Sequence, residues 1–139
     1  MRAPILACLV ALSPALGAAE GTPAPEGAEV YFIEPADGAS VSSPVRVVFG
    51  ARGIGIAPAG VEHERTGHHH LIVNEELEGE ELDQSIPADE NHIHFGGGQT
   101  EAEVDLPPGT HTLQLVMGDA NHVPHDPPIV SERITVTVE

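Results

Sequence analysis

The sequence predicts an all-β fold, an immunoglobulin-like β-sandwich of about seven strands, on three observations. Short segments alternate apolar and polar residues with a period of two, glycine and proline separate these segments, and no segment keeps a helical period. The nearest approach to a helix, Glu75 to Asp83, is interrupted by Gly79. A chain of 139 residues without an internal repeat is long enough for one domain with one core.

The expected strands of the first half are separated by turn and loop sequences. Val30 to Ile33 is a strand that ends at the turn sequence Glu34 to Gly38. Val45 to Phe49 is the second strand, and a loop rich in glycine, alanine and proline, Ala51 to Gly67, follows it. The third strand, His69 to Val73, is apolar enough to lie at the centre of a sheet.

The second half continues the same pattern. An acidic surface loop, Asn74 to Glu90, precedes a short strand, Asn91 to Phe95. Thr100 to Leu106 alternates between apolar residues on one face and acidic residues on the other. Thr112 to Met117 and Val130 to Val138 are the last two strands, and both alternate in the same way.

The N-terminus is typical of a secretory signal peptide. A basic start, Met1-Arg2, precedes an apolar run from Ala3 to Leu16 and small residues up to Ala19. We expect residues 1–19 to be the signal peptide, 20–28 a flexible lead-in and 29–139 a single β-sandwich domain, located in the periplasm or secreted. No second apolar stretch approaches about 20 residues, so no membrane span is expected.

Cysteine and charge restrict the function further. The only cysteine, Cys8, lies inside the expected signal peptide; acylation at Cys8 would make a lipoprotein but would leave only seven residues upstream. Without the signal peptide the chain has no thiol for disulfides, thiolate catalysis or zinc binding. The net charge of −17, without any lysine, disfavours nucleic acid and anionic membranes and favours cationic partners.

Nine histidines occur, and most are grouped in sequence. Two groups have the i, i+2 spacing that places imidazoles on one face of a strand, about 6.6 Å apart. A third group lies in a proline-rich loop. In an immunoglobulin-like sandwich the three connections that carry these groups lie at one end. The predicted metal ligands are His68, His70, His92, His94, His122 and His125.

The remaining histidines have simpler interpretations. His111 shares the parity of core residues and is expected to pack at a strand end, and His63 lies among charged residues and is expected to face solvent. His69 shares the parity of Leu71 and Val73, which predicts a hydrogen-bonded core residue.

Two functions remain open at this stage. The first is an exported protein that holds zinc or Cu(II) with imidazoles, for binding, delivery or stabilisation of the fold, with Asp119 or Asp126 orienting a ligand ring. Its metal affinity should fall as the pH drops through about 6.5, because ligating imidazoles must be neutral. The second is an immunoglobulin-like interaction module of the cell envelope, with a metal-free histidine network and an envelope protein as its partner. An enzyme is open only as a metal hydrolase or oxidase, and no residue is marked as its base.

Three segments resemble one protein family. They are Thr66 to Leu71, His94 to Thr100 and Gly118 to Pro128, and together they are similar to the bacterial domain-of-unknown-function family 4399, small exported proteins. The resemblance runs from about Val30 to Val138. It supports the domain boundaries and the grouping of the three motifs, and it implies no activity.

Overall fold

The computed structural model describes residues 21–139, so the expected signal peptide lies outside the described residues. The strands are β1 (Glu29–Glu34), β2 (Ser40–Val41), β3 (Val45–Arg52), β4 (Gly55–Ile56), β5 (Thr66–Val73), β6 (His92–His94), β7 (Glu101–Val104), β8 (Gly109–Gly118) and β9 (Ile134–Val138). One short 3-10 helix, η1 (Gly79–Asp83), lies in the acidic loop. Within this part of the chain, the helical structure is too short to cross a membrane. The all-β prediction is confirmed.

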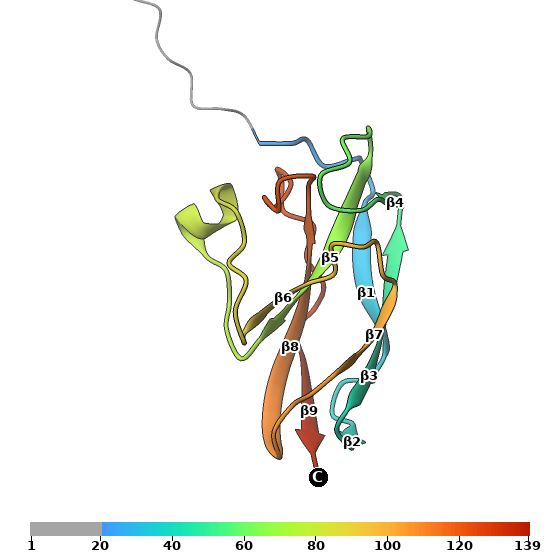
Figure 1. The fold of residues 1–139 in the computed structure, drawn as a ribbon, viewed down its shortest axis with the longest axis vertical. Helices are drawn as coiled ribbons and strands as arrows, with labels where there is room; N and C mark the ends of the chain where they lie inside the picture. The colour runs from blue at the N-terminus through green and yellow to red at the C-terminus, as the bar shows by residue number, and fades with distance from the viewer. Residues whose placement is uncertain (1–20) are drawn as a thin grey trace, which may run out of the picture.

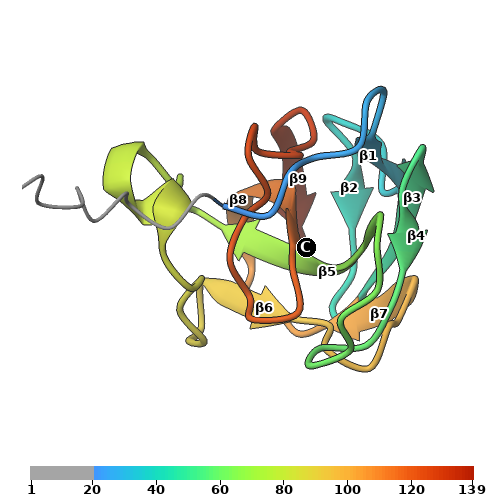
Figure 2. The ribbon, with the colours of Figure 1, turned by 90° about the horizontal axis from the view of Figure 1, so that it is seen from above.

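The strands form two sheets with one main core between them (Figures 1 and 2). One sheet has the order β1-β3-β7 and is antiparallel. The other has the order β2-β9-β8-β5-β4. Both β4 and β6 pair with the free side of β5, β4 near its start and β6 near its end. The pairs β2–β9 and β4–β5 are parallel. The acidic loop with η1 projects from the six-stranded sheet at the side of β6 (Figure 1).

The main core follows from the alternation of the strands. Its members include Val47 and Phe49 of β3 and Leu113 and Leu115 of β8, all buried. Burying a side chain of this size stabilises a fold by about 1.5–3 kcal/mol. The intervening residues of β9, such as Thr135 and Thr137, are exposed, as period-two alternation requires.

Strand β5 is buried on both faces of its sheet. Leu71 and Val73 point into the main core, whereas Ile72 points outward and packs with Ile86 and Val116 in a second cluster. The outer face is covered there because the acidic loop folds back across it. The positions of β5 that share the face of Ile72 are therefore removed from solvent although they lie outside the sandwich core.

The structure differs from the predicted strand list in two added strands and in several bounds. β3 continues to Arg52, and β5 and β8 begin three residues earlier than predicted, so the loop expected from Ala51 to Gly67 is shorter. The strands β2 and β4 were not predicted, because two residues are too few to show alternation. The last strand begins at Ile134 instead of Val130. Residues 129–131 meet β8 at an isolated bridge, with hydrogen bonds from the Met117 N–H to the Ile129 carbonyl and from the Ser131 N–H to the Leu115 carbonyl.

Candidate metal centre

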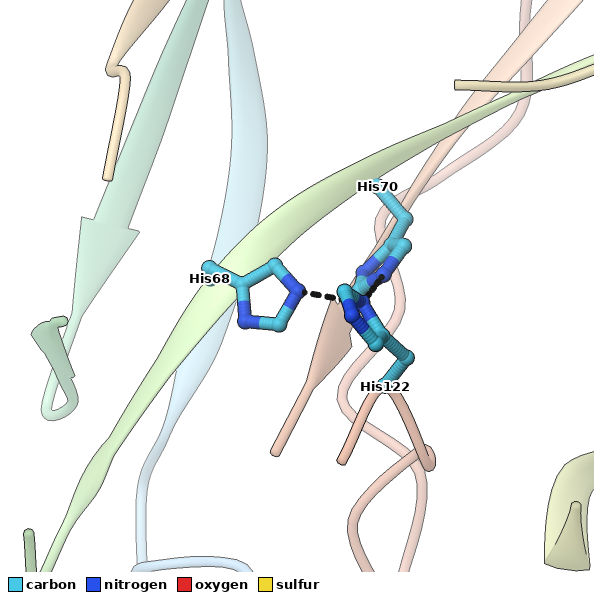
Figure 3. A group of neighbouring side chains, drawn as sticks. All are labelled: His68, His70 and His122. Atoms are coloured by element: carbon cyan, nitrogen blue, oxygen red, sulfur yellow. Dashed lines mark hydrogen bonds between the residues drawn. The ribbon is translucent and has the colours of Figure 1, made fainter. Parts of the chain in front are cut away.

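Strand β5 supplies two imidazoles to the outer face of the six-stranded sheet (Figure 3). His68 and His70 are two residues apart and share this face, and neither exposes any surface to solvent. Their ring centroids lie 4.5 Å apart. Space for the His70 ring exists because residue 118 on the neighbouring strand β8 is glycine: a Cβ there would lie 2.3 Å from Cε1 of His70.

The loop between β8 and β9 supplies the third imidazole, His122. A turn closes on Asp119, whose carbonyl accepts the N–H of His122 and whose Oδ1 accepts the N–H groups of Asn121 and Val123. His122 has φ = 63°, a left-handed conformation that only a few per cent of non-glycine residues adopt. Such strain persists where the surrounding structure fixes it and is frequent at functional sites. Here the hydrogen bonds of Asp119 fix it.

Three imidazole nitrogens meet at one point in front of β5 (Figure 3). Nδ1 of His122 lies 3.0 Å from Nε2 of His68 and 3.3 Å from Nε2 of His70. One ligand atom from each ring lies within 4.8 Å of the other two. Ligand nitrogens around tetrahedral zinc, at Zn–N distances of about 2.0–2.1 Å, are about 3.3 Å apart. The three histidines therefore have nearly the spacing that a metal ion requires.

His94 lies next to this group through the sheet register. In the antiparallel pair of β5 and β6, His94 is opposite His70, and its ring packs 4.4 Å from the His70 ring and 4.5 Å from the His122 ring. Its Nε2–H donates to the carbonyl of Pro87 at 2.7 Å. His94 is not a member of the convergent group of three.

His92 and His125, the other two predicted ligands, make contacts elsewhere. His92 is opposite Ile72, two register positions beyond His94, and its ring lies between the carboxylates of Asp89 and Glu75. His125 is buried, and its Nε2–H donates to the carbonyl of Thr66 at 3.3 Å. The structure thus brings three of the six predicted residues together and places a fourth beside them.

The other histidines are accounted for by packing and exposure. His111 is buried at the start of β8, where its Nε2–H donates to the Pro107 carbonyl and its Nδ1 accepts from the Asn74 amide. His63 is exposed. His69 points into the core against Phe49, with ring centroids 5.0 Å apart. The expectation that His69 is hydrogen-bonded is wrong, because neither of its nitrogens has a partner among the described residues.

Asp119 and Asp126 do not orient a ligand ring by a hydrogen bond in this structure. Both oxygens of Asp119 are used within the loop and its surroundings, since Oδ2 accepts the hydroxyl of Thr22 at 2.7 Å. The residues before β1 also lie along this loop: the Ala24 N–H donates to the Asp126 carbonyl, and the Asp126 N–H donates to the Thr22 carbonyl. Asp119 therefore shapes the backbone that carries His122.

The electrostatic environment keeps the three imidazoles neutral at pH 7. Burial, and then repulsion from neighbouring histidines, lowers the pKa of His68 from 6.5 to about 4 and that of His70 to about 2. Burial and the nearby His94 also lower the pKa of His122. Neutral imidazole is the form that ligates metals. Protons should therefore compete with a metal only well below the pH of about 6.5 that the sequence suggested.

Each of the two strand imidazoles has one nitrogen without a partner. Nδ1 of His68 and Nδ1 of His70 are buried and have no hydrogen bond among the described residues. An unsatisfied buried polar group costs about 1–3 kcal/mol. These are not the nitrogens that converge on His122: an ion bound at the two Nε2 atoms would leave both Nδ1 atoms without a partner, so they do not distinguish a metal-bound group from a metal-free one.

Comparisons with known proteins give the family of this chain. No curated protein and no solved structure matches it. One family model does match, over residues 47–139, which span β3 to the end of β9 and include all three histidine groups. This segment is more than half of the chain, and it agrees with the resemblance carried by the three motifs. The chain therefore belongs to the family described as Domain of unknown function (DUF4399).

Proposed function

We propose that this chain is an exported protein that binds one transition-metal ion, zinc or Cu(II), through His68, His70 and His122. One observation carries the proposal: three imidazole nitrogens from two separate segments converge, at 3.0 and 3.3 Å along two of the three pairs. Imidazole ligation suits both metals. Copper(I) is disfavoured because it prefers sulfur, and Met117, the methionine closest in sequence, is fully buried in the main core.

Two further properties support metal binding. The lowered pKa values keep the rings neutral, so binding does not require the removal of protons at pH 7. Gly118 leaves room for the His70 ring, and the hydrogen bonds of Asp119 hold His122 over the strand. Because the donors are held near their ligating positions by the fold, little conformational entropy is lost on binding.

Export and the fold type complete the proposal. The N-terminal sequence has the order of a signal peptide, and zinc or copper is available to a periplasmic or secreted protein without competition from cytosolic thiols. We infer that the fold is immunoglobulin-like, on the strand orders β1-β3-β7 and β9-β8-β5 in two facing sheets. The net charge of −17 attracts cations towards the protein.

Zinc titration of four proteins tests the proposal. The variants are the His70→Gln/His122→Gln double substitution, and two single controls, His63→Gln at an exposed position and His111→Gln at a buried position outside the group. Replacing a residue that only hydrogen-bonds to a metal ligand costs about 10–100-fold in metal affinity. Replacing two ligands should therefore cost more than about 100-fold. The controls should bind like the wild type. Equal affinity in the double variant would show that the group does not hold the metal, and an interaction module would then be the better interpretation.

A further inference from the structure

The proposed centre contains three protein donors, and the neighbouring groups that could supply a fourth lie outside the convergent group. The nearest is His94: its Nε2–H donates to the Pro87 carbonyl at 2.7 Å, which leaves Nδ1 as its free donor, but His94 is not a member of the group whose ligand atoms lie within 4.8 Å of one another. The His94 ring is tilted by 33° from the His122 ring, with ring centroids 4.5 Å apart, so it lies beside the group without belonging to it.

The other candidates are held more firmly. Both oxygens of Asp119 accept hydrogen bonds, from the hydroxyl of Thr22 and from two backbone N–H groups. His92 is placed between two carboxylates, and His125 is bound to the backbone of β5. Recruiting Asp119 or His92 as a ligand requires breaking such a contact, and His125, whose Nδ1 has no partner among the described residues, is not a member of the convergent group.

Solvent can reach the group on one side. His68 and His70 are fully buried, whereas His94 and His122 are partly exposed. An ion held by the three nitrogens thus has protein behind it, formed by β5, and accessible surface next to the rings of His94 and His122. Tetrahedral zinc needs about four donors, so one position is left to a group from outside the chain.

We propose that the centre is an open three-histidine site whose fourth coordination position takes a small exogenous donor, water or a monodentate anion. The inference rests on the proposed function and selects among its roles. Structural zinc sites are closed by four protein ligands, whereas sites with three protein ligands keep a position for exchange. At an open position an incoming donor binds the metal before an imidazole leaves, so the ion can be exchanged without first being released into solution. The site therefore has the composition of one at which an exogenous donor exchanges, in contrast to a closed site that only stabilises the fold.

Cobalt(II) provides the probe, because its visible spectrum reports the ligands of a site that zinc occupies silently. The intact protein is loaded with one equivalent of Co(II) and titrated with sodium azide. The experiment is repeated with His94→Gln, which keeps an N–H donor for Pro87 but has no imidazole, and with His92→Gln as the matched control on the same face of β6. An open site predicts a saturable spectral change with azide in all three proteins. It also predicts Co(II) affinity in His94→Gln within about tenfold of the wild type.

Two results would overturn the inference. A spectrum that azide leaves unchanged in the wild type, or a loss of Co(II) affinity above 100-fold in His94→Gln alone, would mean that His94 closes a four-histidine site. The azide titration of the wild type decides the question even if His94→Gln fails to fold. Failure of the proposed function is distinguishable, since a protein that binds no metal gives no Co(II) spectrum before azide is added.

Discussion

Replacing Gly118 with alanine should disable the centre without removing any ligand. A Cβ at this position would lie 2.3 Å from Cε1, 2.8 Å from Nδ1 and 3.3 Å from Nε2 of His70, whereas ordinary contacts begin at 3.4 Å. The His70 ring must therefore move by about 1 Å, and metal–ligand distances tolerate only about ±0.2 Å. Zinc affinity should fall by at least about tenfold, and overpacking should destabilise the metal-free protein by about 1–3 kcal/mol.

Competition with a chromophoric zinc chelator measures the affinity, and thermal unfolding of the metal-free protein measures the stability. Gly97→Ala is the matched control: it makes the same substitution at an exposed glycine, where the new methyl group meets only the end of the Gln99 side chain. It should retain the affinity of the wild type. A folded Gly118→Ala protein that binds zinc as tightly as the wild type would refute the assignment of His70 as a ligand.

Three other predictions concern acid stability, the ligand loop and the bound metal. Burial lowers the pKa of His69 to about 4, so between pH 6.5 and 4 the unfolded chain binds a proton at this residue that the native state does not bind. The free energy of unfolding therefore falls by up to about 3 kcal/mol as the pH drops through this range. Urea unfolding at pH 7 and 4.5 should show that His69→Leu removes this part of the loss, and an unchanged loss would mean that burial of His69 does not cause it. Asp119→Ala should weaken zinc binding about tenfold, because it removes the hydrogen bonds that hold the loop of His122. Asp126→Ala, which changes an exposed side chain, should leave the zinc affinity unchanged. Equal affinities of the two variants would mean that other contacts hold the loop. Free zinc at 100 times its dissociation constant should raise the melting temperature by about 10 °C in scanning calorimetry, and the absence of a shift would exclude binding to the native state.

Much of the fold was predictable because period-two alternation is a local property of the chain. The strands β1, β3 and β7 show it clearly and lie near their predicted positions. The pairing of β6 with β5 is a long-range contact that no local pattern encodes. Sequence reasoning placed the three histidine groups at one end of a sandwich, joined by its loops. The structure instead joins His70 and His94 through the register of adjacent strands, on the outer face of a sheet.

The difference between local patterns and long-range pairing also explains which site residues could be identified from the sequence. His68 and His70 followed from i, i+2 spacing, and His122 from its stiff loop. The spacing of His92 and His94 is identical, but β6 runs antiparallel to β5, so His94 meets the group and His92 continues past it. Sequence could not reveal this because the direction and register of a strand are set by its neighbours. The left-handed conformation of His122 carried no sequence signal either.

If three imidazoles hold one metal ion, the metal content of the purified protein shows it. The protein is purified without a tag, equilibrated by dialysis against buffered zinc at pH 7, and analysed by elemental mass spectrometry. We predict one zinc ion per chain, retained by the wild type and absent from the His70→Gln/His122→Gln variant. A wild-type protein that carries no zinc and no copper, or equal metal in both proteins, would contradict it.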